Sequence, residues 1–145
     1  MFIRYVNSTP ASDDVKTTNV SNKKNRVLLV DDEPDIVYLI KRGLERNKFE
    51  VDAYIDPLLA LQNFKSGLYQ LLLLDIKMQK MDGIELFNRI KKQDNKVKVC
   101  FFSASEYIAS NYENSFQKPS HQVLFISKPI SIPEMIKQIK EFLNM

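Results

Sequence analysis

The chain has 145 residues, a length that is enough to bury a hydrophobic core. Of these residues 44% are hydrophobic and 27% are charged, a composition typical of an ordinary globular domain. Its net charge of +3 gives no basic face for direct nucleic-acid binding, and its single cysteine excludes an internal disulfide or a cysteine metal cluster. Apolar runs fall short of the about 18 residues that a membrane helix needs, and the N-terminus lacks a secretory signal, so we expect a cytoplasmic protein without a membrane partner.

The first part of the chain, residues 1–25, is predicted to be a flexible arm, because residues 7–25 are rich in Ser, Thr, Asn, Asp and Lys and show no periodicity. The apolar side chains between positions 2 and 6 could add a short strand. We expect the folded domain to occupy residues 26–145.

Apolar runs typical of buried strands alternate with amphipathic segments along this domain. Asp56, Asp82 and Ser131 precede apolar helical stripes and are expected N-caps, and Gly67 is an expected C-cap. The alternation predicts an α/β fold with a parallel sheet between two layers of helices. The strands are predicted at 27–30, 49–54, 71–75, 97–102 and 123–126, and the helices at 34–47, 57–67, 83–93, 105–119 and 131–143.

Two of the strands differ in their expected surroundings. The leucines at 71–74 form a continuous apolar run, typical of a strand buried on both faces, and Asp75 stands at its carboxyl end. Residues 49–54 alternate apolar and polar side chains, which predicts a half-exposed strand near the sheet edge. Gly43 weakens helix 34–47 and is expected to mark a close packing contact.

Polar side chains follow four of the strands: Asp31 and Asp32 the first, Asp75 the third, Ser103 the fourth and Lys128 the fifth. Because the carboxyl ends of parallel strands share one edge of a sheet, these side chains can converge on one site. Three carboxylates suit Mg²⁺, and a lysine and a hydroxyl beside them suit a phosphoryl group. Asp75 is placed to be a nucleophile that forms an aspartyl-phosphate.

Each feature also has a purely structural interpretation. Asp31 and Asp32 could cap the following helix, Asp75 could be a turn residue, and Lys128 could belong to a loop. Their occurrence together, at four strand ends in chain order, favours a functional site.

The motifs at these strand ends carry a resemblance. They are Val-Asp-Asp-Glu-Pro at 30–34, Leu-Leu-Asp-Ile-Lys-Met at 73–78, Met-Asp-Gly ending at Gly83, Phe-Ser-Ala at 102–104 and Ser-Lys-Pro ending at Pro129. Over residues 26–145 the chain resembles the receiver domain of two-component response regulators. The resemblance implies a flavodoxin-like, doubly wound, five-stranded parallel sheet in the order 2-1-3-4-5 with helices on both faces.

By position, the resemblance implies that Asp75 accepts a phosphoryl group from a histidine kinase, a phosphotransfer protein or a small acyl phosphate. It implies that Asp32, Asp75 and the backbone carbonyl of Lys77 bind Mg²⁺, with Asp31 acting through water. Lys128 would pair with the phosphoryl oxygens. The chain would not be an enzyme beyond its own phosphorylation and dephosphorylation.

Further positions match the switching parts of such domains. Ser103 and Phe125 correspond to the switch pair, and Pro129 to a proline that usually follows a cis peptide bond. A downstream partner would bind the face formed by helix four, strand five and helix five. The resemblance also implies that Lys77 and Ser105 would flank the path of the hydrolysing water and tune the lifetime of the phosphorylated state.

The sequence also departs from the family pattern. Gln79 stands where the family usually has proline, and residues 117–121 replace its usual small pair, with His121 expected at the surface. Two alternatives stay open, an aspartyl-phosphate phosphohydrolase and an interaction module that does not depend on phosphorylation. With no effector domain after residue 145, we expect a stand-alone receiver, or a receiver whose output domain is missing from this sequence.

Overall fold

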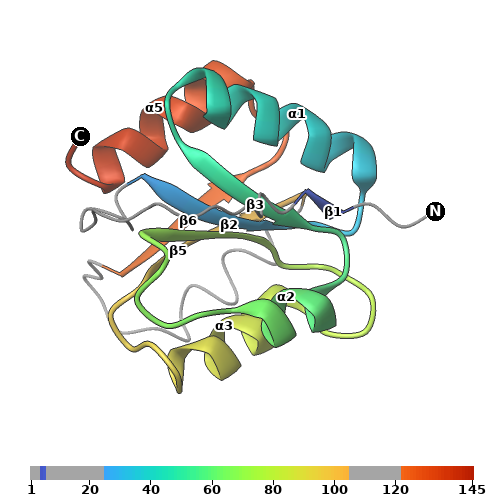
Figure 1. Cartoon of the computed structure of the whole chain (residues 1–145). Helices are drawn as coiled ribbons and strands as arrows, with labels where there is room; N and C mark the ends of the chain where they lie inside the picture. The colour runs from blue at the N-terminus through green and yellow to red at the C-terminus, as the bar shows by residue number, and fades with distance from the viewer. Residues whose placement is uncertain (1–3, 6–24, 105–121) are drawn as a thin grey trace.

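The computed structural model of the chain describes residues 4–5, 25–104 and 122–145 (Figure 1). These residues form one sheet in the order β1-β3-β2-β4-β5-β6. Helices α1 and α5 cover one face of the sheet, and α2 and α3 cover the other (Figure 1). The strands are β1 Arg4–Tyr5, β2 Arg26–Val30, β3 Glu50–Tyr54, β4 Leu71–Asp75, β5 Lys98–Ser103 and β6 Val123–Ser127, and the helices are α1 Pro34–Arg46, α2 Pro57–Asn63, α3 Gly83–Lys91 and α5 Ile132–Phe142.

The last five strands, β2 to β6, are parallel and stand in the predicted order 2-1-3-4-5, so the predicted doubly wound fold is confirmed. A short antiparallel strand, β1, adds to the outer edge of β3, with Arg4 opposite Tyr54 and Tyr5 opposite Ala53. The strand expected near the N-terminus is therefore formed, within the segment 1–25 that the sequence predicts as an arm.

Strand β4 lies at the centre of the sheet and is buried on both faces, as predicted. Leu71 and Leu73 pack in the hydrophobic cluster beneath α1 and α5. Leu72 and Leu74 pack in the second cluster, beneath α2 and α3. All four leucine side chains are inaccessible to solvent, so the strand that ends in Asp75 is held by packing from both layers.

Several predicted helix ends are confirmed. The side chains of Asp56, Asp82 and Ser131 accept hydrogen bonds from backbone N–H groups in the first turns of α2, α3 and α5. Gly43 of α1 lies against Ile132, whose side chain a Cβ at position 43 would overlap. The expected close contact is thus the crossing of α1 and α5.

Helix α2 is shorter than predicted. It ends at Asn63, and Phe64 is extended and buried, with its ring stacked on Tyr69 at 5.7 Å between centroids. Gly67, at φ +80°, lies in the following turn instead of closing the helix. In the apolar stripe predicted after Asp56, Leu58 does not face the core, because its side chain is 45% exposed. The helix predicted at 105–119 lies outside the described residues.

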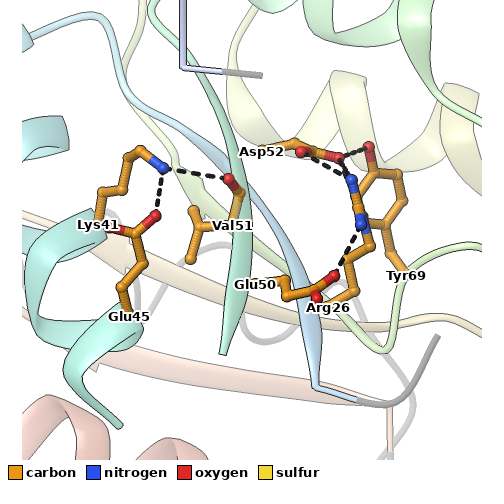
Figure 2. A network of polar contacts seen from close by, with 7 residues as sticks. All are labelled: Arg26, Lys41, Glu45, Glu50, Val51, Asp52 and Tyr69. Atoms are coloured by element: carbon orange, nitrogen blue, oxygen red, sulfur yellow. Dashed lines mark hydrogen bonds and ion pairs between the residues drawn. The ribbon is translucent and has the colours of Figure 1, made fainter. Parts of the chain in front are cut away.

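The polar residue in the middle of β3, Asp52, is buried, so the prediction of a half-exposed strand is wrong there. Figure 2 shows the reason: the Arg26 guanidinium donates hydrogen bonds of 3.0–3.2 Å to both oxygens of its carboxylate, and the Tyr69 hydroxyl donates another at 2.7 Å. Arg26 also pairs with Glu50 at 2.8 Å. These contacts join β2, β3 and the entry to β4 at the sheet edge opposite the carboxyl ends.

Candidate functional site

The side chains that the sequence singles out meet at the carboxyl edge of the sheet. Asp31 and Asp32 follow β2, Asp75 and Ser103 end β4 and β5, and Lys128 follows β6. Parallel pairing sets this convergence, because it aligns the strands from their first residues. All of these residues except Asp31 line an open cleft of about 630 Å³. Its lining comprises Asp32, Glu33, Asp75, Lys77, Met78, Gln79, Ser103, Ala104 and Lys128.

Three carboxylates form the acidic part of the site. Asp31, Asp32 and Asp75 each place an oxygen within 4.8 Å of the others. Asp31 and Asp75 are buried. Burial raises the pKa of Asp31, and burial together with repulsion from Asp31 raises the pKa of Asp75 to about 7. The site therefore concentrates negative charge in a poorly solvated place.

Lys128 is the cation that faces this charge. Its Nζ lies 3.4 Å from Asp31 Oδ2 and 3.7 Å from Asp75 Oδ1. The same nitrogen lies 4.7 Å from the centre of the Phe102 ring, which supports it from the core side. Its backbone N–H donates to the Ser103 carbonyl at 2.6 Å, which fixes the loop after β6 to the end of β5. The bond from Lys128 to Pro129 is cis, as the resemblance implies.

Asp31 and Asp32 do not cap helix α1 in the ordinary way. The N-cap residue is Glu33, and its side chain makes no capping hydrogen bond. The Asp31 carboxylate accepts from the Glu33 N–H, and the Asp32 carboxylate accepts from the Gln79 N–H, both at 3.0 Å. The capping alternative therefore fails for Asp32, whose partner lies in the loop after β4.

Gly83 sits directly behind the carboxyl end of β4. Its N–H donates to the Ile76 carbonyl at 2.8 Å, and a Cβ at this position would overlap the backbone carbonyl of Asp75. The residue that begins α3 thus has to be glycine for the helix to approach Asp75 this closely.

The switch positions are only partly described. Ser103 is buried at the end of β5, and Phe125 is half-buried in β6 with its ring 5.4 Å from that of Phe101. Ser105 and His121 lie outside the described residues, and with them the helix-four part of the expected partner face.

The donor set fits a hard divalent cation. Carboxylate oxygens are the ligands that Mg²⁺ and Ca²⁺ prefer. A cleft that is open to solvent suits Mg²⁺ in particular, because this ion keeps part of its hydration shell. Asp31 and Asp75 share the ion pair with Lys128, which leaves negative charge for a cation to neutralise.

Two contacts of the site were not predicted from the sequence. Phe102 supports Lys128 with its ring, although its only sequence signal is its place beside Ser103. Gln79 acts through its backbone N–H, for which residue type carries no signal beyond the departure from proline.

The fold and this edge of the sheet define a doubly wound α/β protein with an acidic cleft at the carboxyl ends of its parallel strands. Residues 27–140 match the family model described as the response regulator receiver domain, and the chain belongs to that family. It is thus a receiver domain of the two-component response regulators, which are signalling switches. In the part of the chain that the structure describes, helices with the length and apolar character of a membrane span are absent.

Known relatives agree with this assignment. The chain is 30% identical over 119 residues to the transcriptional regulatory protein PrrA of Mycobacterium leprae, covering 82% of this chain and 50% of that protein. It thus spans about half the length of that relative. The response regulator receiver protein CpdR of Brucella abortus is 27% identical, with 81% and 96% covered. Among solved structures, the response regulator TrrA of Thermotoga maritima, in complex with Mg(2+)-BeF, is 29% identical with a TM-score of 0.69, covering 81% of this chain and 98% of that one.

Proposed function

We propose that the chain is a Mg²⁺-dependent phosphoacceptor switch in which Asp75 receives the phosphoryl group. The observation that carries the proposal is the setting of Asp75: a carboxylate at the end of the buried central strand, open to a cleft and 3.7 Å from Lys128. A nucleophile in this place is held rigidly by packing on both faces of β4.

Transfer is a displacement at phosphorus. A carboxylate oxygen of Asp75 attacks the phosphorus of a phosphohistidine or of a small acyl phosphate, and an acyl-phosphate bond forms. The P–N or P–O bond of the donor breaks, and the donor keeps the electron pair. Lys128 offers positive charge to the oxygens of the transferred group, and the Ser103 hydroxyl offers a hydrogen-bond donor once the group is in place.

The metal would be held by Asp32, by Asp75 and by the backbone carbonyl of Lys77, with Asp31 reaching it through water. When bound, Mg²⁺ supplies the positive charge that lets an anionic carboxylate approach an anionic phosphoryl group. The carboxylate oxygens within 4.8 Å of one another support this assignment, as does the related TrrA, solved with Mg(2+)-BeF.

Signalling would follow from the contacts of the new phosphoryl group. Ser103 moves toward it, and Phe125, which is half-buried on Phe101, takes up the space that Ser103 leaves. The surface of helix four, β6 and α5 then changes its affinity for a downstream partner. The donor is a histidine kinase or phosphotransfer protein, and the protein acts in the cytoplasm.

Incubation with acetyl phosphate and Mg²⁺, followed by intact-mass spectrometry, tests the proposal. We expect one phosphoryl group per chain in wild type and in the control Asp35→Asn, whose exposed side chain lies on α1 away from the cleft lining. Asp75→Asn should incorporate none. A phosphoryl group on Asp75→Asn at the wild-type level would refute the assignment of Asp75. Continuous release of phosphate from added esters would identify a phosphohydrolase. A wild-type protein that is not modified at all would identify an interaction module.

A further inference from the structure

In the loop between β4 and α3, a backbone N–H group contacts one of the three carboxylates of the site. The N–H of Gln79 donates to Asp32 Oδ2 at 3.0 Å, across 47 positions of sequence. Both residues line the cleft, and Asp32 is the least buried of the three carboxylates. Asp31 and Asp75 are fixed by burial and by Lys128, so Asp32 is the one whose orientation depends on this bond.

The loop is shaped so that the Gln79 N–H stays in place. The N–H of Met81 donates to the Gln79 carbonyl and that of Gly83 to the Ile76 carbonyl, both at 2.8 Å. Lys80 between them has φ +72°, a left-handed conformation that a lysine adopts only when its surroundings impose it. These backbone contacts make the loop a closed turn with a defined direction for each amide.

A second contact reaches the loop from the N-cap residue of α2. Lys80 Nζ donates to Asp56 Oδ2 at 2.8 Å, and this pairing lowers the pKa of Asp56. The Lys80 side chain is 55% exposed, so solvent weakens the pair and its contribution is small. The turn itself, and not this ion pair, therefore has to hold the Gln79 amide.

We propose that the backbone amide of Gln79 is a positioning group that holds Asp32 ready for a divalent cation. A hydrogen bond from N–H to a charged carboxylate is stronger than one between neutral groups, and it removes rotational freedom that the metal would otherwise have to restrict. Proline, which such domains usually have here, lacks the N–H and cannot make the bond. The inference rests on the proposed metal site.

The test compares Gln79→Pro with Gln79→Ala. Both remove the glutamine side chain, but only proline removes the N–H, and Mg²⁺ is titrated into each metal-free protein while amide NMR shifts are followed. We expect Gln79→Ala to bind Mg²⁺ like wild type and Gln79→Pro to bind it about three- to tenfold more weakly. Equal binding by the two variants would overturn the inference, as would tighter binding by Gln79→Pro, because the N–H would then compete with the metal.

A second measurement does not depend on how Gln79→Pro folds. In metal-free wild type the Gln79 amide should exchange its hydrogen slowly, and Asp32→Ala, which removes the acceptor, should speed that exchange about tenfold or more. Unchanged exchange would overturn the inference. Wild type that binds Mg²⁺ while the variants do not differ would reject this inference alone, whereas wild type that binds no Mg²⁺ would reject the proposed metal site and the inference with it.

Discussion

Replacing Asp75 by asparagine should stabilise the metal-free protein, although it destroys the proposed phosphoacceptor. The carboxylate oxygens of the site lie within 4.8 Å of one another. At this distance and an effective dielectric constant of about 20, each pair of charges repels by about 3 kcal/mol. Attraction to Lys128, 3.7 Å away, and water in the open cleft offset part of this. We therefore expect the free energy of unfolding to rise by about 1–2 kcal/mol.

Urea unfolding in EDTA at pH 8, above the raised pKa of Asp75 of about 7, measures the effect with the carboxylate ionised. The control is Asp35→Asn, which removes an exposed negative charge from the first turn of α1 and should destabilise by about 0.3–1 kcal/mol. Millimolar Mg²⁺ should stabilise wild type by mass action, about 1.4 kcal/mol at ten times its dissociation constant, and so shrink or reverse the advantage of Asp75→Asn.

The reasoning would be refuted by an Asp75→Asn variant no more stable than wild type in EDTA, together with a wild type that Mg²⁺ does not stabilise. Repulsion and metal binding both arise from the three converging carboxylates, and the EDTA and Mg²⁺ measurements test them separately. If Asp75→Asn is more stable in EDTA but Mg²⁺ does not stabilise wild type, the carboxylates repel one another and the proposed metal site is wrong.

Two further changes test the scaffold by urea unfolding. Tyr69→Phe should lower the free energy of unfolding by about 1–2 kcal/mol at pH 8, because the buried carboxylate of Asp52 loses a hydrogen-bond donor. Burial and this bond raise the pKa of Tyr69 well above its usual value, so the stability that the hydroxyl contributes is complete below pH about 10, the unfolded pKa, and is lost as the pH rises above it. A difference in stability between wild type and Tyr69→Phe that does not narrow above pH about 10 would contradict the assignment. Gly83→Ala should lower the free energy of unfolding by about 2–3 kcal/mol, because the new Cβ would overlap the Asp75 backbone. Gly67→Ala, where the space is open but φ is +80°, should lower it by about 1 kcal/mol. Equal losses of stability in the two variants would show that crowding behind Asp75 is unimportant.

Periodicity and capping were sufficient to predict most of the fold, because both are local properties of the chain. The apolar run 71–74 specifies a central strand by itself, and Asp82 specifies the start of α3. Asp52 was mispredicted because alternation assigns a polar side chain to solvent, while its partners Arg26 and Tyr69 come from 26 and 17 positions away. The end of α2 was mispredicted for a similar reason, since Phe64 leaves the helix to stack on Tyr69.

The convergence of the site was predictable because parallel strands bring their carboxyl ends together whatever the details of packing. Its finer contacts were not. A backbone donor such as Gln79 has no residue-type signature, and the ring of Phe102 beneath Lys128 follows from three-dimensional packing. The sequence therefore indicates which side chains gather at the edge, while their orientation depends on the loops.

Strand β1 covers part of the outer edge of β3. Without it, β3 would be an outer strand of the described sheet, and the unpaired N–H and C=O groups of an outer strand are a template on which other chains can add. Arg4 and Tyr5 occupy the carboxyl half of that edge, opposite Tyr54 and Ala53. A protein shortened to start at Arg26 would keep every residue of the cleft, so we expect it to retain its chemistry and to lose resistance to aggregation instead.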